Sequence, residues 1–226
     1  MERHLLTHLT ALRDTVITYL PRHLVAQEIT LPPPDHVRGS FLYGTALFAD
    51  ISGFTAMTEA LSHQERGQDR RREGAEKITG IVDDYFTEML TPLLAYDGLL
   101  LKFGGDAIMA LFLGEEHALR AVQAALTMQE RMRRFRRVEV FGQTFSLRMT
   151  VGLGTGSLFA ASVGTRERRE YAVMGHAVRE MAHAEDWARA GEVVINEEAR
   201  AAVGDRIVVG PPREGYHPVQ RILSPP

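Results

Sequence analysis

The stretch Leu47–Thr55, LFADISGFT, runs from an apolar segment into a carboxylate and then into a glycine turn. The residues before Asp50, SFLYGTALFA, have the apolar density of a buried strand, and SGFTAMTEALS has the pattern of a short helix. An aspartate in this place either caps the helix or holds a metal ion over a phosphate. The choice between these interpretations depends on what lies beside Asp50 in the sheet.

A second aspartate lies in a related place. The segments LLLKF and AIMALFL read as two strands joined by a tight turn, Gly104-Gly105-Asp106. Consecutive elements are usually neighbours in a sheet, so we expect Asp50 and Asp106 to meet at one edge. Alone, Asp106 is equally well explained as a turn former. Together the two carboxylates predict a magnesium site for a nucleoside triphosphate, and Gly53 lets the amides that follow it form an anion cradle.

The remaining elements alternate in a way that is typical of a mixed sheet with helices. Apolar periodicity predicts two long helices, over Ala75–Tyr96 and over 116–135. It also predicts a strand pair, TFSLRMTVGLGTG with SLFAASVG, and then a strand, a helix and a strand, which are EYAVM, His176–Arg189 and EVVI. The order predicts an α/β fold, an α+β sandwich with helices on one face. The glycines of VGLGTG are expected to allow close backbone approach and a turn, because their spacing is wrong for dinucleotide binding.

The chain divides into an appendage, one domain and a tail. An amphipathic stripe predicts an N-terminal helix, packed on the domain or on a partner, from Leu5, Leu9, Leu12, Val16 and Tyr19. Pro21 interrupts this stripe, and LPPPDHVRGS reads as a stiff connector. We therefore expect a helical segment over 1–40, a compact domain over 41–210 and a tail over 211–226. The final SPP leaves open whether a linker to further domains begins there.

Composition excludes several classes of function. The chain has 226 residues, of which 45% are hydrophobic, enough for one sizeable core. Its net charge of −3 predicts neither a nucleic-acid nor an anionic-membrane partner, and the five arginines of RMRRFRR are read as a solvated helix end. The lack of cysteine excludes thiolate catalysis and fits a reducing compartment. Because Lys102 and Asp106 interrupt the most apolar segment, we expect a soluble, cytoplasmic protein.

The two aspartate motifs resemble those of a known family. LFADISGFT, REGAEKI and LLLKFGGDAIMALF resemble the motifs of class III nucleotide cyclases, most of all the first catalytic domain of the soluble, bicarbonate-responsive adenylyl cyclases and their bacterial relatives. The resemblance covers about residues 41–210 and implies a ferredoxin-like βαββαβ fold. It implies that Asp50 and Asp106, with the backbone of Ile51, hold two Mg²⁺ or Mn²⁺ ions. It also implies a triphosphate cradle formed by Gly53, Phe54 and Thr55.

The same resemblance implies an active site between two cyclase domains. One domain supplies the metal aspartates, and the other supplies a lysine and an acid that read the purine, then an asparagine and an arginine for the ribose and the transition state. In this second half, Lys102 matches the family's purine-reading lysine. The purine-reading acid falls on Ala172, the ribose-orienting asparagine on Arg179 and the transition-state arginine on His183. Alanine accepts no hydrogen bond and histidine is mostly neutral at pH 7, so Arg179 is the one candidate substitute in this half.

Two further positions depart from the family pattern. The family's basic triphosphate ligand falls on Thr150, and Arg148, on the same side of the strand, is the candidate stand-in. The bicarbonate-binding arginine falls on Ala182, with Lys102 and Val173 at other positions around that pocket, so bicarbonate activation is not expected.

These residues favour one function over two others. The first is an ATP-using cyclase domain that makes 3′,5′-cyclic AMP and pyrophosphate with a second cyclase domain, as a homodimer or a heterodimer. The alternative is a degenerate cyclase that binds nucleotide and metal and regulates a partner. A diguanylate cyclase is disfavoured, because Ala107 stands where that family has a glutamate. The sequence leaves ATP against GTP open.

Overall fold

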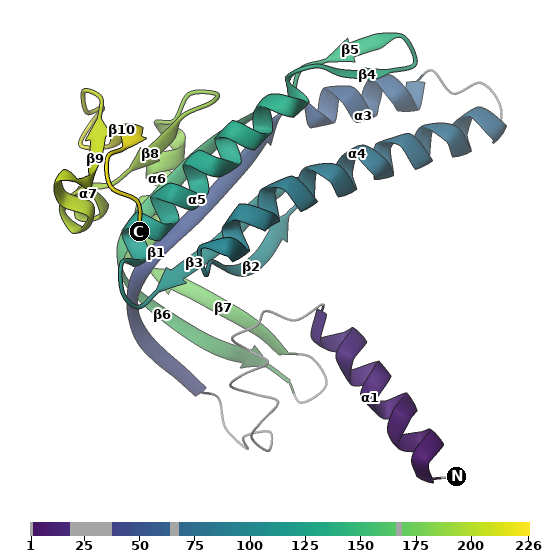
Figure 1. Cartoon of the computed structure of the whole chain (residues 1–226), viewed down its shortest axis with the longest axis horizontal. Coiled ribbons are helices and arrows are strands. Elements are labelled where there is room, and N and C mark those ends of the chain that lie inside the picture. Colours follow the sequence, from purple (N-terminus) through teal and green to yellow (C-terminus); the bar gives the residue numbers. More distant parts are fainter. Residues whose placement is uncertain (1, 19–37, 64–67, 166–168) are drawn as a thin grey trace.

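The computed structural model describes residues 2–18, 38–63, 68–165 and 169–226, and in this part of the chain one eight-stranded sheet dominates (Figure 1). The sheet has the order β2-β3-β1-β6-β8-β10-β9, and β7 pairs with the later half of β6. Its strands are β1 (Arg38–Ser52), β2 (Leu99–Gly104), β3 (Ala107–Leu113), β6 (Arg148–Gly164), β7 (Arg169–Gly175), β8 (Val193–Ile195), β9 (Ile207–Val209) and β10 (His217–Ile222). A separate hairpin joins β4 (Val138–Val140) to β5 (Gln143–Phe145).

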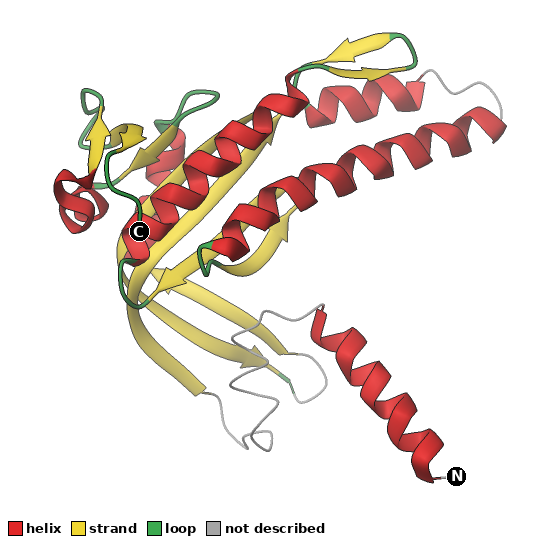
Figure 2. Ribbon diagram, viewed as in Figure 1, coloured by secondary structure: helices red, strands yellow, loops and turns green. Residues whose placement is uncertain are grey.

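The helices cover both faces of this sheet. They are α1 (Glu2–Thr18), α3 (Phe54–His63), α4 (Gln68–Ala95), α5 (His117–Met132), α6 (His176–Asp186) and α7 (Glu197–Val203). Figure 2 shows the long helices α4 and α5 lying along one face. The mixed α+β architecture is as predicted, but the expectation of helices on one face alone is wrong.

The alternation of side chains along β1 sorts the core into two layers. Leu47, Ala49 and Ile51 point to the face that α4 and α5 cover and join the main core there. Ala46 points to the other face, where it packs in a smaller cluster with Met181 of α6. Since successive strand residues face opposite sides, Asp50 lies on the α6 face of the sheet. This placement sets the surroundings of its carboxylate.

Helix α6 approaches β6 closely because two glycines lie beneath it. A Cβ added at Gly154 would lie 2.2 Å from the Met181 nitrogen and 2.3 Å from the Ala177 oxygen. A Cβ added at Gly152 would lie 2.5 Å from the Glu185 nitrogen. Close backbone approach at VGLGTG is therefore confirmed. The expected turn is wrong, because this stretch lies within the single strand β6 and pairs with β1 throughout.

Three other expectations differ from the structure. Helix α4 begins at Gln68, seven residues before the predicted start at Ala75. The segment 211–226, read as a tail, contributes β10, which pairs with β8 and β9. Leu9 and Leu12 of the N-terminal stripe are exposed on α1, so they do not pack on the domain, and packing on a partner stays a prediction. Most of the proline-rich connector, residues 31–37, lies outside the described residues. No helix within the described ranges is both long and apolar enough to cross a membrane.

A buried polar network joins the central strands to the C-terminal unit. The hydroxyls of Thr45 on β1 and Thr155 on β6 are 2.6 Å apart, and Thr45 also contacts His117 Nδ1 at 2.8 Å. The Asn196 side chain accepts from the Thr155 N–H at 3.0 Å and donates to its carbonyl at 3.0 Å. Its oxygen also accepts from the Ala199 N–H and so caps α7. The backbone N–H and the carbonyl of Thr155 are thus both hydrogen-bonded to the Asn196 side chain.

Replacing this asparagine tests the network. We expect Asn196→Ala to lower the free energy of unfolding by about 3 kcal/mol, because it removes a helix cap and leaves two buried backbone groups of Thr155 unpaired. Urea unfolding with an unchanged m-value measures the effect. Thr144→Ala, on the exposed strand β5, is the control and should stay within about 0.5 kcal/mol of the wild type. A loss below about 1 kcal/mol for Asn196→Ala would contradict this assignment.

Candidate active site

Asp50 and Asp106 lie together at one edge of the sheet. Strands β1 and β3 are antiparallel, and their pairing runs to Ala49 opposite Ile108. The next residue on β1 is Asp50, and the turn before β3 carries Asp106. Burial raises the pKa of the Asp50 carboxyl, the charges of Asp106 and then Glu185 raise it further, and the Ile51 N–H lowers it in part. The adjacency expected from the hairpin is therefore present.

A third carboxylate, Glu185, comes from the end of α6 and was missed by sequence reasoning. Its Oε1 accepts a hydrogen bond of 2.6 Å from the Thr150 hydroxyl, and Thr150 lies opposite Asp50 in the β1–β6 ladder. Thr150 was considered only as the position of a lost basic ligand. No local pattern distinguishes Glu185, because its place depends on α6 packing over Gly152.

This edge of the sheet fits a divalent cation. Among the described residues, no arginine or lysine forms an ion pair with Asp50, Asp106 or Glu185, and the Ile51 N–H offsets only in part the effect of the other two carboxylates on Asp50. Carboxylate oxygens are the ligands that magnesium prefers, and a bound cation would remove the repulsion. Asp50 and Asp106, at the ends of adjacent strands, are the residues that could bind this cation together. Glu185, from the end of α6, adds negative potential at Asp50.

The loop after Asp50 has the geometry of an anion cradle. Gly53 has a φ of 96°, and a Cβ there would lie 2.7 Å from the Ser146 carbonyl oxygen, so only glycine fits. Helix α3 begins at the next residue, Phe54, which places free amides of its first turn at this edge. A cavity of about 270 Å³ lies here, lined by Phe54, Thr55, Val82, Tyr85, Phe86, Gly105 and Asp106.

Tyr85 of α4 is buried in the core and also lines this cavity. Its hydroxyl lies 3.4 Å from the Asp106 carbonyl oxygen. Burial raises the pKa of Tyr85, and the charges of Asp106 and Asp50 raise it further. The phenol therefore stays neutral near the carboxylates and can act only as a hydrogen-bonding group.

Neither Lys102 nor Arg148 lies among the residues that line the cavity beside Asp106. Lys102 is exposed on the edge strand β2, opposite Met109. Arg148 begins β6 opposite Ser52, is also exposed, and lines a different cavity on the other side of Gly53. The Lys102 side chain is exposed to solvent, and a ligand could contact it there. Arg148 lines the other cavity and not the one beside Asp106.

The residues of the partner half lie on β7 and α6. Ala172 pairs with Ala161 in the β6–β7 ladder. Arg179 donates to His176 Nδ1 at 2.9 Å and to Glu180 Oε1 at 3.3 Å, so its guanidinium is engaged within its own helix. His183 is 52% exposed, with Nδ1 3.8 Å from Asp186. None of the three lines the cavity beside Asp106.

A separate group of possible metal ligands lies at the start of α6. In the described ranges, only His176, Glu180 and Glu198 place three ligand atoms within 4.8 Å of one another. His183 is not a member of this group. Arg179 pairs with Glu180, and His176 Nε2 contacts Glu198 at 3.0 Å, so these side chains form an ion-pair network in this structure.

Known proteins resemble this chain in sequence and in fold. It is 28% identical over 189 residues to adenylate cyclase type 10 of Oryctolagus cuniculus, covering 80% of this chain and 11% of that protein. It is 28% identical over 176 residues to adenylate cyclase 1 of Rhizobium meliloti (strain 1021), covering 74% of this chain and 24% of that protein. The crystal structure of the guanylyl cyclase Cya2 superposes with a TM-score of 0.64 at 25% identity, covering 83% of this chain and 94% of that one.

These curated relatives are much longer than the present chain, which spans between a tenth and a quarter of their length. The family model that matches is the adenylate and guanylate cyclase catalytic domain, over residues 43–212. Those residues include both aspartate motifs, α6 and the glycines beneath it. The chain therefore belongs to the adenylate and guanylate cyclase catalytic domain family.

Proposed function

We propose that this chain is an ATP-using nucleotide cyclase domain that works at an interface with a second cyclase domain. The observation that carries the proposal is the meeting of Asp50 and Asp106 at one sheet edge with no cationic partner among the described residues. Two carboxylates placed in this way suit a pair of Mg²⁺ or Mn²⁺ ions on a triphosphate. When bound, the ions supply activation of the ribose 3′-hydroxyl and neutralisation of the leaving phosphates.

The chain's own residues then position the substrate. The amides at Gly53, Phe54 and Thr55 bind the triphosphate at the start of α3, where unpaired N–H groups favour an anion. The backbone of Ile51 adds a ligand beside Asp50. Lys102 belongs to the purine-reading half, so in a dimer it would face the nucleotide that the metal aspartates of the second cyclase domain hold. The 3′-oxygen attacks the α-phosphorus, its proton is lost, and the bond to the β-phosphate oxygen breaks, giving 3′,5′-cyclic AMP and pyrophosphate. We infer ATP rather than GTP because both curated relatives described above are named adenylate cyclases.

The second half of the site requires a partner domain. Ala172 offers no hydrogen bond to a base, and His183 lies beside Asp186 on an exposed helix face. Arg179 is tied to His176 and Glu180, which opposes its use as a substitute for the family's asparagine or arginine. We therefore propose a heterodimer in which the partner supplies the ribose-orienting and transition-state groups, with activity in the cytoplasm.

The same engagement of Arg179 favours a second candidate function. A chain whose transition-state positions are filled by Ala172, a tethered Arg179 and His183 would bind metal and nucleotide without turnover. Such a degenerate cyclase would act by regulating the domain with which it pairs. The two candidate functions share the metal and nucleotide site at Asp50. They differ only in whether pairing with another domain gives cyclic-nucleotide formation.

The carboxylate repulsion predicts an unusual stability effect. Because the pKa of Asp50 is raised in the folded state, its charge destabilises the fold above its unfolded pKa near 3.8, and this cost is absent at lower pH. Asp50→Asn should therefore raise the melting temperature of the metal-free chain at pH 7, by about 2–4 °C for each kcal/mol relieved. The same variant should lose most of the stabilisation that Mn²⁺ gives the wild type.

Thermal unfolding with and without Mn²⁺, after treatment with EDTA, measures both effects. Asp84→Asn, on the exposed side of α4, is the matched control and should change neither. A Mn²⁺-dependent stabilisation of equal size in Asp50→Asn would contradict the metal assignment.

Mixing experiments separate the two candidate functions. The purified chain is combined with ATP, Mn²⁺ and a class III domain that lacks its metal aspartates but keeps the asparagine and arginine. We expect cyclic AMP formation to rise by about 10²–10³ over the chain alone, the usual effect of one transition-state donor. Asp50→Ala in this chain should abolish the increase. Nucleotide binding without turnover in every mixture would favour the degenerate cyclase.

A further inference from the structure

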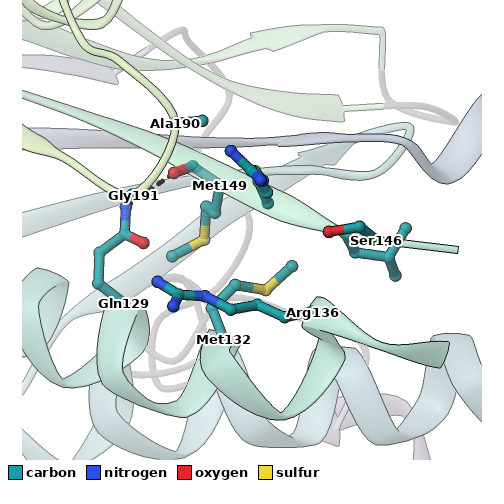
Figure 3. A pocket seen from close by; sticks show the side chains of 9 residues that line it. Gln129, Met132, Arg136, Ser146, Met149, Ala190 and Gly191 are labelled. Atoms are coloured by element: carbon teal, nitrogen blue, oxygen red, sulfur yellow. Dashed lines mark hydrogen bonds between the residues drawn. The ribbon is translucent and has the colours of Figure 1, made fainter.

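A second cavity lies apart from the cavity beside Asp106. It has a volume of about 320 Å³ and lies between the end of α5 and the start of β6 (Figure 3). A shallower hollow of about 610 Å³ adjoins it and shares Gln129, Arg136 and Gly191 with it. Volumes of this size are typical of small-molecule sites.

The arginine-rich end of α5 divides into paired and unpaired cations. Arg131 and Arg134 both pair with Glu88, and Arg137 pairs with Glu139. Within the described part of the chain, Arg133 and Arg136 have no carboxylate partner; Arg136 lines both cavities, whereas Arg133 lines only the shallower hollow. Arg136 is exposed, as the solvated-face interpretation expects, and it is also the one of these two that reaches the deeper cavity. Figure 3 shows Arg136 extending along the cavity toward the side where Gln129 lies.

The other lining groups are also fixed in orientation. Gln129 Nε2 donates to the carbonyls of Met149 and Glu192, each at 2.9 Å, which leaves its Oε1 as a free acceptor at the cavity. Met132 and Met149 are 3% and 1% exposed and give the cavity an apolar floor. With Arg148 also in its lining, the cavity presents two guanidinium groups, a hydrogen-bond acceptor and an apolar surface together.

We propose that this cavity binds a small organic anion. Its phosphate or carboxylate group would pair with Arg136, its apolar body would lie on Met132 and Met149, and a hydroxyl or amino group would donate to Gln129 Oε1. An unpaired guanidinium beside apolar side chains suits such a ligand better than inorganic phosphate, because the apolar body adds burial that a bare ion lacks.

The cavity shares a wall with the loop after Asp50. Ser146 lines the cavity, and its carbonyl oxygen is the atom that a Cβ on Gly53 would meet at 2.7 Å. A ligand that moves Ser146 would therefore move Gly53. The anion would then regulate triphosphate binding. This regulatory role rests on the proposed function, whereas the binding of the anion does not depend on it.

Methionine-methyl NMR locates binding without any activity assay. The chain is labelled with [methyl-¹³C]methionine and titrated with phenyl phosphate, benzoate, inorganic phosphate and benzyl alcohol. We expect saturable shifts of the Met132 and Met149 methyls with phenyl phosphate or benzoate, the tighter of which identifies the head group. Met57 and Met89, buried elsewhere, should not move. Inorganic phosphate and benzyl alcohol should bind at least about tenfold more weakly, because each lacks one of the two matched features.

Arginine variants test the charge contact. Arg136→Gln should weaken phenyl phosphate binding about tenfold, and Arg136→Lys, which keeps the charge but not the two-pronged donor, should give an intermediate affinity. Arg134→Gln is the matched control, since Arg134 pairs with Glu88 and lines neither cavity. The absence of saturable shifts at Met132 and Met149 in the folded wild type, or equal binding by Arg136→Gln, would overturn the proposal.

Discussion

The antiparallel ladder between β1 and β6 is the constraint on which the rest of the molecule depends. It runs without interruption from Arg38 opposite Ser162 to Ser52 opposite Arg148. Because side chains alternate, this register decides which residues meet α5 and which meet α6. A slip of one residue would turn Asp50 from the α6 face to the α5 face and bury a carboxylate among apolar side chains. The buried contact between Thr45 and Thr155 opposes such a slip, since those hydroxyls meet only in the observed register.

Stability and the candidate chemistry make opposite demands on the sheet edge. Burial and the charges of Asp106 and Glu185 raise the pKa of Asp50, so its ionised carboxylate is disfavoured at this edge. The fold tolerates this arrangement because its well-satisfied polar groups lie elsewhere, above all where Asn196 pairs with both backbone groups of Thr155. Strain near a site, compensated by a rigid scaffold, is the usual pattern for a catalytic centre.

Sequence reasoning identified the features that depend on local chemistry. The tight turn at Asp106 and the strand end at Asp50 follow from glycine and apolar spacing, and sequential elements tend to be neighbours, so their meeting could be predicted. Glu185 could not, because it reaches Asp50 only through the packing of a helix more than a hundred residues later. The continuity of β6 was missed because glycine-rich stretches normally end strands, whereas here the missing side chains make room for α6. Strand β10 was missed because its pairing with β8 and β9 is set by tertiary contacts, which short apolar segments do not encode.

The glycines of β6 also fix how far the fold can vary. With backbone packed on backbone at Gly152 and Gly154, α6 has no layer of side chains that could adapt to a change in helix position. A single methyl group at Gly154 would have to lift the helix as a rigid rod, and Glu185, one turn beyond Met181, would be carried with it. A substitution on the exposed face of α6, where Arg179 and His183 lie, leaves this contact unchanged, whereas a substitution at Gly152 or Gly154 displaces the whole helix. The position of α6 is therefore independent of the side chains on its exposed face.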